Sequence, residues 1–314
     1  MKSMTSLLLI VVVAVGLFAG GCDGPGRQNK KAASKADVTM PENIGQLQRK
    51  AEQGDAEAQN ELGDIYRNGR DIAQNDSQAA TWYQKAADQG NAEAQFQLGW
   101  MCSTGHGVAR DDRQAAVWYR KAADQGNAGA QYNLGWMYER GLGVAKDDHQ
   151  AVTWYQKAAD QGEAEAQVGL GRMYEEGRGV VKDEHQAVVW FQKAANQGNA
   201  GAQLWLGTMY DEGRGVAKDE HQAVAWYQKA ASQGNAMAQV YLGAAYVKGH
   251  GVPQDLAEAY AWSVLAAENR TGVSAEDQEM SIELRDFLRQ KLTPAQIAAG
   301  EQRAKVLRAG LKRK

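Results

Sequence analysis

The chain has 314 residues, of which 44% are hydrophobic and 23% are charged, as in an ordinary folded domain. Its formal net charge is −3 at pH 7, so no overall positive charge favours nucleic-acid binding. Only 4 prolines occur, and alanines are abundant, which favours helices. We therefore expect an all-α protein that does not bind nucleic acid.

Residues 1–21 differ in composition from the rest of the chain. Lys2 precedes an uncharged, largely apolar run of 14 residues, Leu7–Gly20. A membrane-spanning helix needs about 20 residues, so this run has the length of a signal-peptide core. Small residues then precede Cys22, which resembles the lipobox of bacterial lipoproteins, although Ala19 replaces the usual leucine. The resemblance implies cleavage before Cys22 and a diacylglycerol on its sulfur. An ordinary secretory signal is the alternative.

Residues 22–41 show no apolar period and are predicted to be a flexible tether. With Cys22 lipidated, the chain is expected on the periplasmic side of a bacterial membrane. Asp23 resembles the signal that retains enterobacterial lipoproteins at the inner membrane. The sequence has 2 cysteines, so a lipidated Cys22 leaves Cys102 without a disulfide partner.

From residue 56 to residue 271 the sequence repeats itself every 36 residues. The six copies begin at Ala56, Ala92, Ala128, Ala164, Ala200 and Ala236. Such a period indicates a solenoid or a propeller, and the apolar spacing favours helices. In the second half of copy two, apolar residues recur at i, i+3, i+4, i+7 and i+8, namely Ala115, Trp118, Tyr119, Ala122 and Ala123. Each copy is predicted to be a helix–turn–helix.

Turn and cap residues agree with this prediction. Asp111 followed by Gln114 has the spacing of a capping box at the start of the second helix. Gly105 and Gly107 are expected to form the turn between the helices, and Gly126 to close the second helix. Residues 42–55 resemble one further second helix and are expected to cap the array. Residues 272–314 hold two more helical patterns, Glu276–Lys291 and Pro294–Ala309, and a basic tail.

The repeated unit strongly resembles the Sel-1-like repeat, a relative of the tetratricopeptide repeat. The elements A-x-x-L-G, G-x-G-V and W-Y-x-K-A-A each stand in at least four copies, and the resemblance covers about 215 residues. Copy one departs from the pattern at Asp71, and copy six at Ser263, Val264 and Leu265. The resemblance implies a right-handed α/α superhelical solenoid of six repeats whose first helices line a concave groove.

No pattern of catalytic or metal-binding residues stands out. The G-x-G-V elements lie between predicted helices, so they are interpreted as turns and not as phosphate loops. One repeat position holds His149, His185 and His221, but helices in neighbouring repeats stack about 10 Å apart, so these imidazoles cannot share one ion. Cys102 occupies a tyrosine position and is expected to be a buried, inert thiol. We expect no cofactor, no metal and no enzymatic activity.

Differences between copies indicate where a partner binds. The first helices vary most at their fifth, sixth and ninth positions, and the sixth and ninth share one helix face. Trp, Tyr and Arg are common interface anchors. The predicted partner-binding residues are Trp100, Trp136, Arg172, Trp205 and Tyr241, with Phe96 and Tyr132 at the fifth position. The alternative is that some of these rings, Phe96 and Tyr132 above all, only pack between helices.

Three functions are compatible with this sequence. The first is a non-catalytic scaffold or adaptor, anchored in the cell envelope through Cys22, that binds an envelope protein on its concave face. The second is an immunity protein that neutralises a toxin delivered by type VI secretion, as some Sel-1-like lipoproteins resemble. The third is a hydrolase of cell-wall or β-lactam type, an activity of cysteine-rich relatives whose cysteines this chain lacks. The scaffold is the preferred interpretation.

Overall fold

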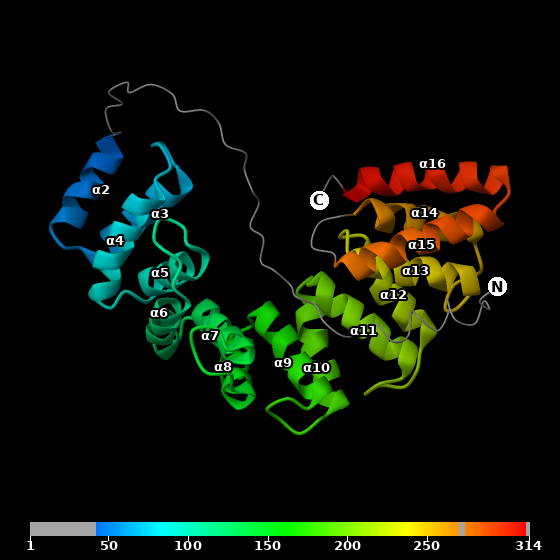
Figure 1. Ribbon diagram of the computed structural model, residues 1–314, viewed down its shortest axis with the longest axis horizontal. Coiled ribbons are helices and arrows are strands. Elements are labelled where there is room, and N and C mark those ends of the chain that lie inside the picture. Colours follow the sequence, from blue (N-terminus) through cyan, green and yellow to red (C-terminus); the bar gives the residue numbers. More distant parts are fainter. Residues whose placement is uncertain (1–41, 270–273, 312–314) are drawn as a thin grey trace. The chain divides into compact units, whose positions relative to one another are not determined.

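The structure, a computed structural model, describes residues 42–269 and 274–311, and within these ranges it holds fifteen helices and no strand (Figure 1). The predicted signal peptide, Cys22, the tether and the last three residues lie outside the described residues. In chain order the helices are α2 (Glu42–Glu52), α3 (Ala56–Asn68), α4 (Asp76–Asp88), α5 (Ala92–Thr104), α6 (Asp112–Asp124), α7 (Ala128–Arg140), α8 (Asp148–Asp160), α9 (Ala164–Glu176), α10 (Glu184–Asn196), α11 (Ala200–Glu212), α12 (Glu220–Ala231), α13 (Ala236–Lys248), α14 (Leu256–Glu268), α15 (Ala275–Lys291) and α16 (Pro294–Leu311). The all-α prediction is confirmed.

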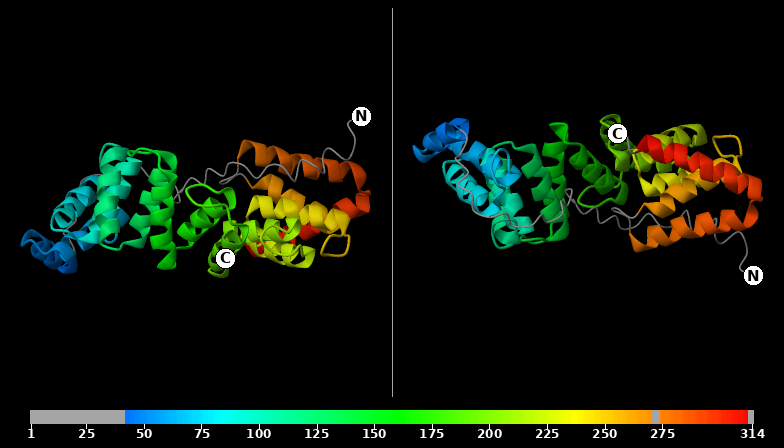
Figure 2. Two further views of the ribbon diagram at one scale, coloured as in Figure 1. Left: turned by 90° about the horizontal axis from the view of Figure 1, so that it is seen from below. Right: turned by 90° about the horizontal axis from the view of Figure 1, so that it is seen from above.

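The described residues form two compact units, which meet between Trp190 and Phe191 of α10. In the first unit, α2 packs on α3, and each helix from α3 to α8 packs on the next along the chain. In the second unit, α11 to α14 pack in the same consecutive manner, and α15 and α16 both cover α14 (Figure 2). Each unit is therefore a stack of helical hairpins, as expected for a solenoid.

Helix ends follow from a few repeated side chains. Asp111 begins α6 by accepting hydrogen bonds from the backbone N–H groups of Arg113 and Gln114, as the predicted box requires. The first helices are capped too, which the sequence analysis did not predict: the Asn91 side chain accepts from the Ala94 N–H at 2.8 Å. The first helix of this repeat ends at Gly105, whose φ of 79° is the left-handed conformation that glycine favours.

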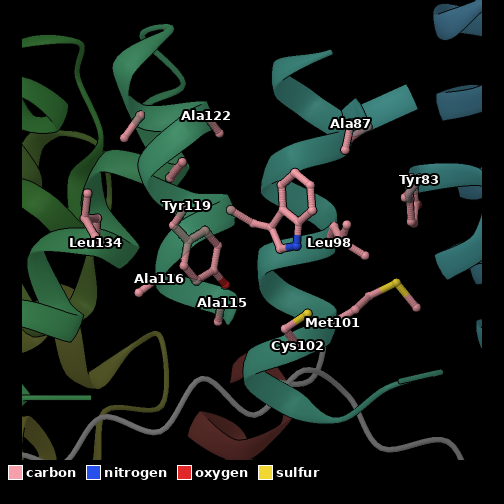
Figure 3. Close-up of a cluster of buried hydrophobic side chains, with 14 of the residues drawn as sticks. Tyr83, Ala87, Leu98, Met101, Cys102, Ala115, Ala116, Tyr119, Ala122 and Leu134 are labelled. Carbon is pink, nitrogen blue, oxygen red and sulfur yellow. The ribbon is translucent and has the colours of Figure 1, made fainter. Parts of the chain in front are cut away.

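The tyrosine of each second helix lies on the helical glycine of the A-x-x-L-G element. Tyr119 is buried among Leu98, Met101 and Ala115 (Figure 3). A Cβ atom on Gly99 would lie 2.7 Å from a carbon of the Tyr119 ring, closer than van der Waals contact allows. The glycine therefore lets the ring approach the backbone of the first helix. Cys102 borders the same cluster and is buried as expected, and this burial raises the pKa of its thiol.

A ladder of glutamines joins successive repeats. The buried amide of Gln95 donates to the Ala87 carbonyl at 3.1 Å, and its oxygen accepts from Gln125 Nε2 at 2.8 Å. The same pair of bonds recurs for Gln131, whose oxygen accepts from Gln161 at 2.7 Å. Because each glutamine bonds to the helix before it and to the helix after it, its buried polar atoms are satisfied and adjacent hairpins are held at a fixed spacing.

Candidate functional site

The predicted partner-binding residues fall into two groups, one in each unit. The first unit carries Phe96 and Trp100 on α5, Tyr132 and Trp136 on α7, and Arg172 on α9. The second carries Trp205 on α11 and Tyr241 on α13. All seven side chains are partly buried, so each combines a contact inside the protein with a surface that faces out.

Trp100 and Trp136 are held in place by cationic side chains. The guanidinium of Arg67, on the preceding first helix, lies 5.6 Å from the centre of the Trp100 ring, and the His106 imidazole stacks on that ring at 4.9 Å. Arg140 lies one turn after Trp136, with its guanidinium 5.7 Å from the ring centre. Such cation–π contacts stabilise a side-chain conformation by about 0.5–1 kcal/mol at exposed sites. These two rings are therefore ordered before any partner binds.

Phe96 and Tyr132 make a different kind of contact. Their rings lie against the buried tyrosines of their own repeats: the ring centres are 6.0 Å apart for Phe96 and Tyr119, and 5.8 Å apart for Tyr132 and Tyr155. At these distances aromatic pairs contribute to packing between helices. The packing role that the sequence left open for the fifth position is thus present at both residues.

Arg172 belongs to a network of buried charges. Its guanidinium lies 3.6 Å from the carboxylate of Glu139, which has only 7% of its side chain exposed. Arg178 approaches the same carboxylate at 3.0 Å and Asp148 at 2.9 Å, and the Tyr155 hydroxyl donates to Glu139 at 2.7 Å. The Glu139 carboxylate is therefore fully engaged, and Arg172 is part of the structure as well as of the exposed face.

In the second unit the predicted residues stack on neighbouring rings. Trp205 lies parallel to Phe191, with an angle of 4° between the rings and 5.6 Å between their centres. Tyr241 stacks on Tyr227 at 5.2 Å, and burial, followed by the charge of Glu212, raises the pKa of Tyr241 to about 12. One edge of each ring remains at the surface while the stacking fixes its plane.

The histidines that share one repeat position are exposed, as the sequence predicted. His149 and His185 lie at the surface, and His221 Nδ1 is 2.9 Å from the Gly251 carbonyl oxygen. Among the described residues no group of three or more His, Cys, Asp or Glu side chains has the arrangement of a metal site. Within that same part of the chain no helix has the length and apolarity needed to cross a membrane.

Some residues near the predicted face were not found from the sequence. Glu139, Arg178 and Tyr155 each carry a polar group into this face, although no sequence argument paired them. A signal was available for the first two, because their repeat positions vary between copies as much as the predicted positions do. The tyrosine position is nearly constant, so only the structure shows which side chain its hydroxyl meets.

Hairpins of similar length, stacked through a glutamine ladder and presenting aromatic rings on their first helices, define a helical-repeat protein of the scaffold type that binds other proteins. The sequence model described as "Sel1 repeat" matches residues 56–91, 92–127, 128–163, 164–199, 200–235 and 236–270. The chain therefore belongs to the Sel1 repeat family, as the sequence resemblance predicted.

Solved structures agree with this assignment. A Sel1 repeat protein from Oxalobacter formigenes is 33% identical, with a TM-score of 0.67, and the match covers 73% of this chain and 92% of that protein. A protective antigen with an SLR fold from uropathogenic Escherichia coli is 31% identical over 88% of this chain and 74% of its own, with a TM-score of 0.39. An immunity protein from Pseudomonas aeruginosa is 22% identical over 80% and 83%, with a TM-score of 0.39. No curated protein matches the chain.

Proposed function

We propose that this protein is a non-catalytic, membrane-anchored scaffold of the bacterial cell envelope that binds a protein partner through the exposed faces of its first helices. The observation that supports binding at this face is the ordering of Trp100 and Trp136 by Arg67, His106 and Arg140. Partly exposed rings that are already fixed lose little conformational entropy on binding, and tryptophan is among the most common interface anchors.

The proposed anchor is a lipid on Cys22, which places the repeats on the periplasmic side of a membrane. The lipobox-like sequence before Cys22 supports this part of the proposal. The test is fractionation of cells that express the full chain or its Cys22→Ser variant. The parent is expected in the membrane fraction after a high-salt wash, and the variant in the soluble fraction. A parent that washes off with salt would contradict the lipid anchor.

Binding is tested by purifying the full chain from mildly solubilised membranes and identifying retained proteins by mass spectrometry. A variant with Trp100, Trp136 and Trp205 changed to alanine is compared with a control in which the exposed Val117, Val181 and Val189 are changed to alanine. A partner retained by the parent and the control but lost by the tryptophan variant, with helical circular dichroism unchanged, supports the proposed face. Equal retention by all three proteins would place binding elsewhere.

The identity of a retained partner separates the scaffold from the immunity protein that the sequence analysis kept as its alternative. An immunity protein binds one toxin tightly, with the toxin encoded beside it, whereas a scaffold retains several envelope proteins more weakly. Turnover of cell-wall or β-lactam substrates by the purified chain, lost on no single substitution in the first helices, would contradict a purely binding role.

A further inference from the structure

The tyrosine hydroxyl of the second helix has a side-chain partner in the first three repeats. Tyr83 donates to Asp64 at 2.7 Å and Tyr155 donates to Glu139 at 2.7 Å, while the Tyr119 hydroxyl lies 3.4 Å from that of Ser103. Buried hydroxyls are expected to be paired in this way, because a buried polar group without a hydrogen bond costs about 1–3 kcal/mol. The repeats thus supply their own internal reference.

Tyr227, the same residue in the fifth repeat, departs from that reference. Its side chain is 3% exposed, and within the described residues its hydroxyl has no hydrogen-bond partner. Asp211 occupies the repeat position that Glu139 holds in the third copy, and its side chain is one methylene shorter. The shorter carboxylate does not reach the hydroxyl, although its charge, after burial itself, contributes to raising the pKa of Tyr227.

The missing contact opens a cavity of about 60 Å³ between α11, α12 and α13, with Tyr227 and Tyr241 in its wall. One water molecule needs about 10–15 Å³ on this measure, so the cavity holds a larger group. Three carboxylates line it, those of Asp211, Glu212 and Glu220, against the ammonium of Lys248 and the imidazole of His250.

The carboxylates differ in how far they are already neutralised. Glu212 pairs with Arg214, and Glu220 pairs with Lys218 at 3.1 Å, a hydrogen bond that lowers the pKa of Glu220. Over the described residues Asp211 has no ion pair, and Lys248 is exposed at the rim with its flexible side chain. An unpaired carboxylate and an unpaired phenol hydroxyl, both facing one cavity beside aromatic rings, match a group that carries positive charge and N–H donors.

We infer that the cavity formed by Asp211, Tyr227 and Tyr241 receives the cationic end of a lysine or arginine side chain from a protein partner. The ammonium or guanidinium donates to the Asp211 carboxylate and to the Tyr227 oxygen, and its stem lies along the Tyr241 ring. This inference rests on the proposed protein-binding function. Tyr241 was predicted as a partner-binding residue, so the cavity lies on the face where binding is proposed.

The test uses the full chain with labelled tyrosines and follows the Tyr227 and Tyr241 ring signals by NMR. The probes are Nα-acetyl-lysine methylamide, its arginine counterpart, and the uncharged Nα-acetyl-norleucine methylamide. Saturable shifts are expected with the two cationic probes and none with norleucine. Lys248→Met removes a like charge from the rim and is expected to tighten binding of the cationic probes. Weaker binding by this variant would contradict the sign of the proposed charge.

Asp211→Glu separates the cavity from general surface charge. The longer carboxylate is expected to reach Tyr227 as Glu139 reaches Tyr155, so this variant keeps the charge, fills the cavity and remains folded. Binding of the cationic probes should weaken about tenfold or more, the loss expected for one charge-assisted hydrogen bond. Asp211→Asn keeps the shape but removes the charge, and the same loss is expected.

The probe titration is independent of whether a natural partner is captured. Probe binding that Asp211→Glu removes supports the cavity even if no protein co-purifies, in which case the proposed function alone fails. Probe binding that survives Asp211→Glu, or no binding of either cationic probe to the parent, overturns the cavity. The capture experiment with the tryptophan variant then decides the proposed function separately.

Discussion

Replacing Gly63 by alanine tests the packing of tyrosine on glycine that every hairpin of the first unit shares. An added Cβ would lie 2.5 Å from one carbon of the Tyr83 ring and 2.6 Å from another. The ring has no free space, because Tyr83 is 0% exposed and its hydroxyl is bonded to Asp64 at 2.7 Å. Overpacking costs about 1–3 kcal/mol, and breaking a hydrogen bond to a carboxylate costs about 1.5–3 kcal/mol.

Alanine returns about 1 kcal/mol through its higher helix propensity. The balance is a destabilisation of about 2 kcal/mol or more. Urea unfolding followed by far-ultraviolet circular dichroism should show a lower midpoint for Gly63→Ala than for the parent. Gly45→Ala is the matched control, because a Cβ there meets only the end of the Arg49 side chain, at 3.9 Å. It should stabilise the chain by about 0.5–1 kcal/mol. Equal or higher stability of Gly63→Ala would refute the packing argument.

Three further outcomes are expected. Gln131→Leu leaves the Ala123 carbonyl and the Gln161 amide without their bonds, and should lower the free energy of unfolding by about 1–3 kcal/mol in urea titrations. In a Cys22→Ser background, Cys102 should resist Ellman's reagent until urea unfolds the chain, because the thiol is buried and its pKa is raised; rapid reaction of the folded protein would contradict this. Burial raises the pKa of Tyr155 well above its ordinary value of 10.0, so the unfolded chain loses this proton first. Stability should therefore be unaffected by Tyr155 below pH 10.0 and fall above it, less steeply in Tyr155→Phe.

The helices and their order could be predicted from the sequence because the same pattern is written six times. Apolar spacing, Asp caps and turn glycines all point to one hairpin, and errors in a single copy are outvoted by the others. The caps of the first helices were missed although Asn91 and its equivalents stand at the same position in four copies. Asparagine before alanine was not taken as a helix start, yet its side chain accepts the bond that an N-cap needs.

The predicted face was harder to derive. Repeat positions indicated which helices carry it, but whether a ring packs inside or faces out depends on its neighbours in space. Trp100 is held by Arg67, which lies one repeat earlier, whereas Phe96 rests on Tyr119 of its own repeat. Glu139 and Asp211 look equivalent in sequence, and a difference of one methylene decides which of them reaches a tyrosine. Such outcomes depend on distances of less than a bond length, which a residue pattern does not encode.

The glutamine ladder also bears on how arrays of this kind can change in length. Each rung joins residues 30 positions apart, such as Gln95 and Gln125, and the next rung begins 36 residues later with Gln131. Deleting or duplicating one whole repeat brings an identical glutamine to each broken rung, so the new junction inherits its bonds ready made. A deletion of any other length leaves two buried amides facing the wrong residues. Gene duplication in units of one repeat is therefore tolerated by the interior of the protein, and the surface side chains are left to diversify between copies.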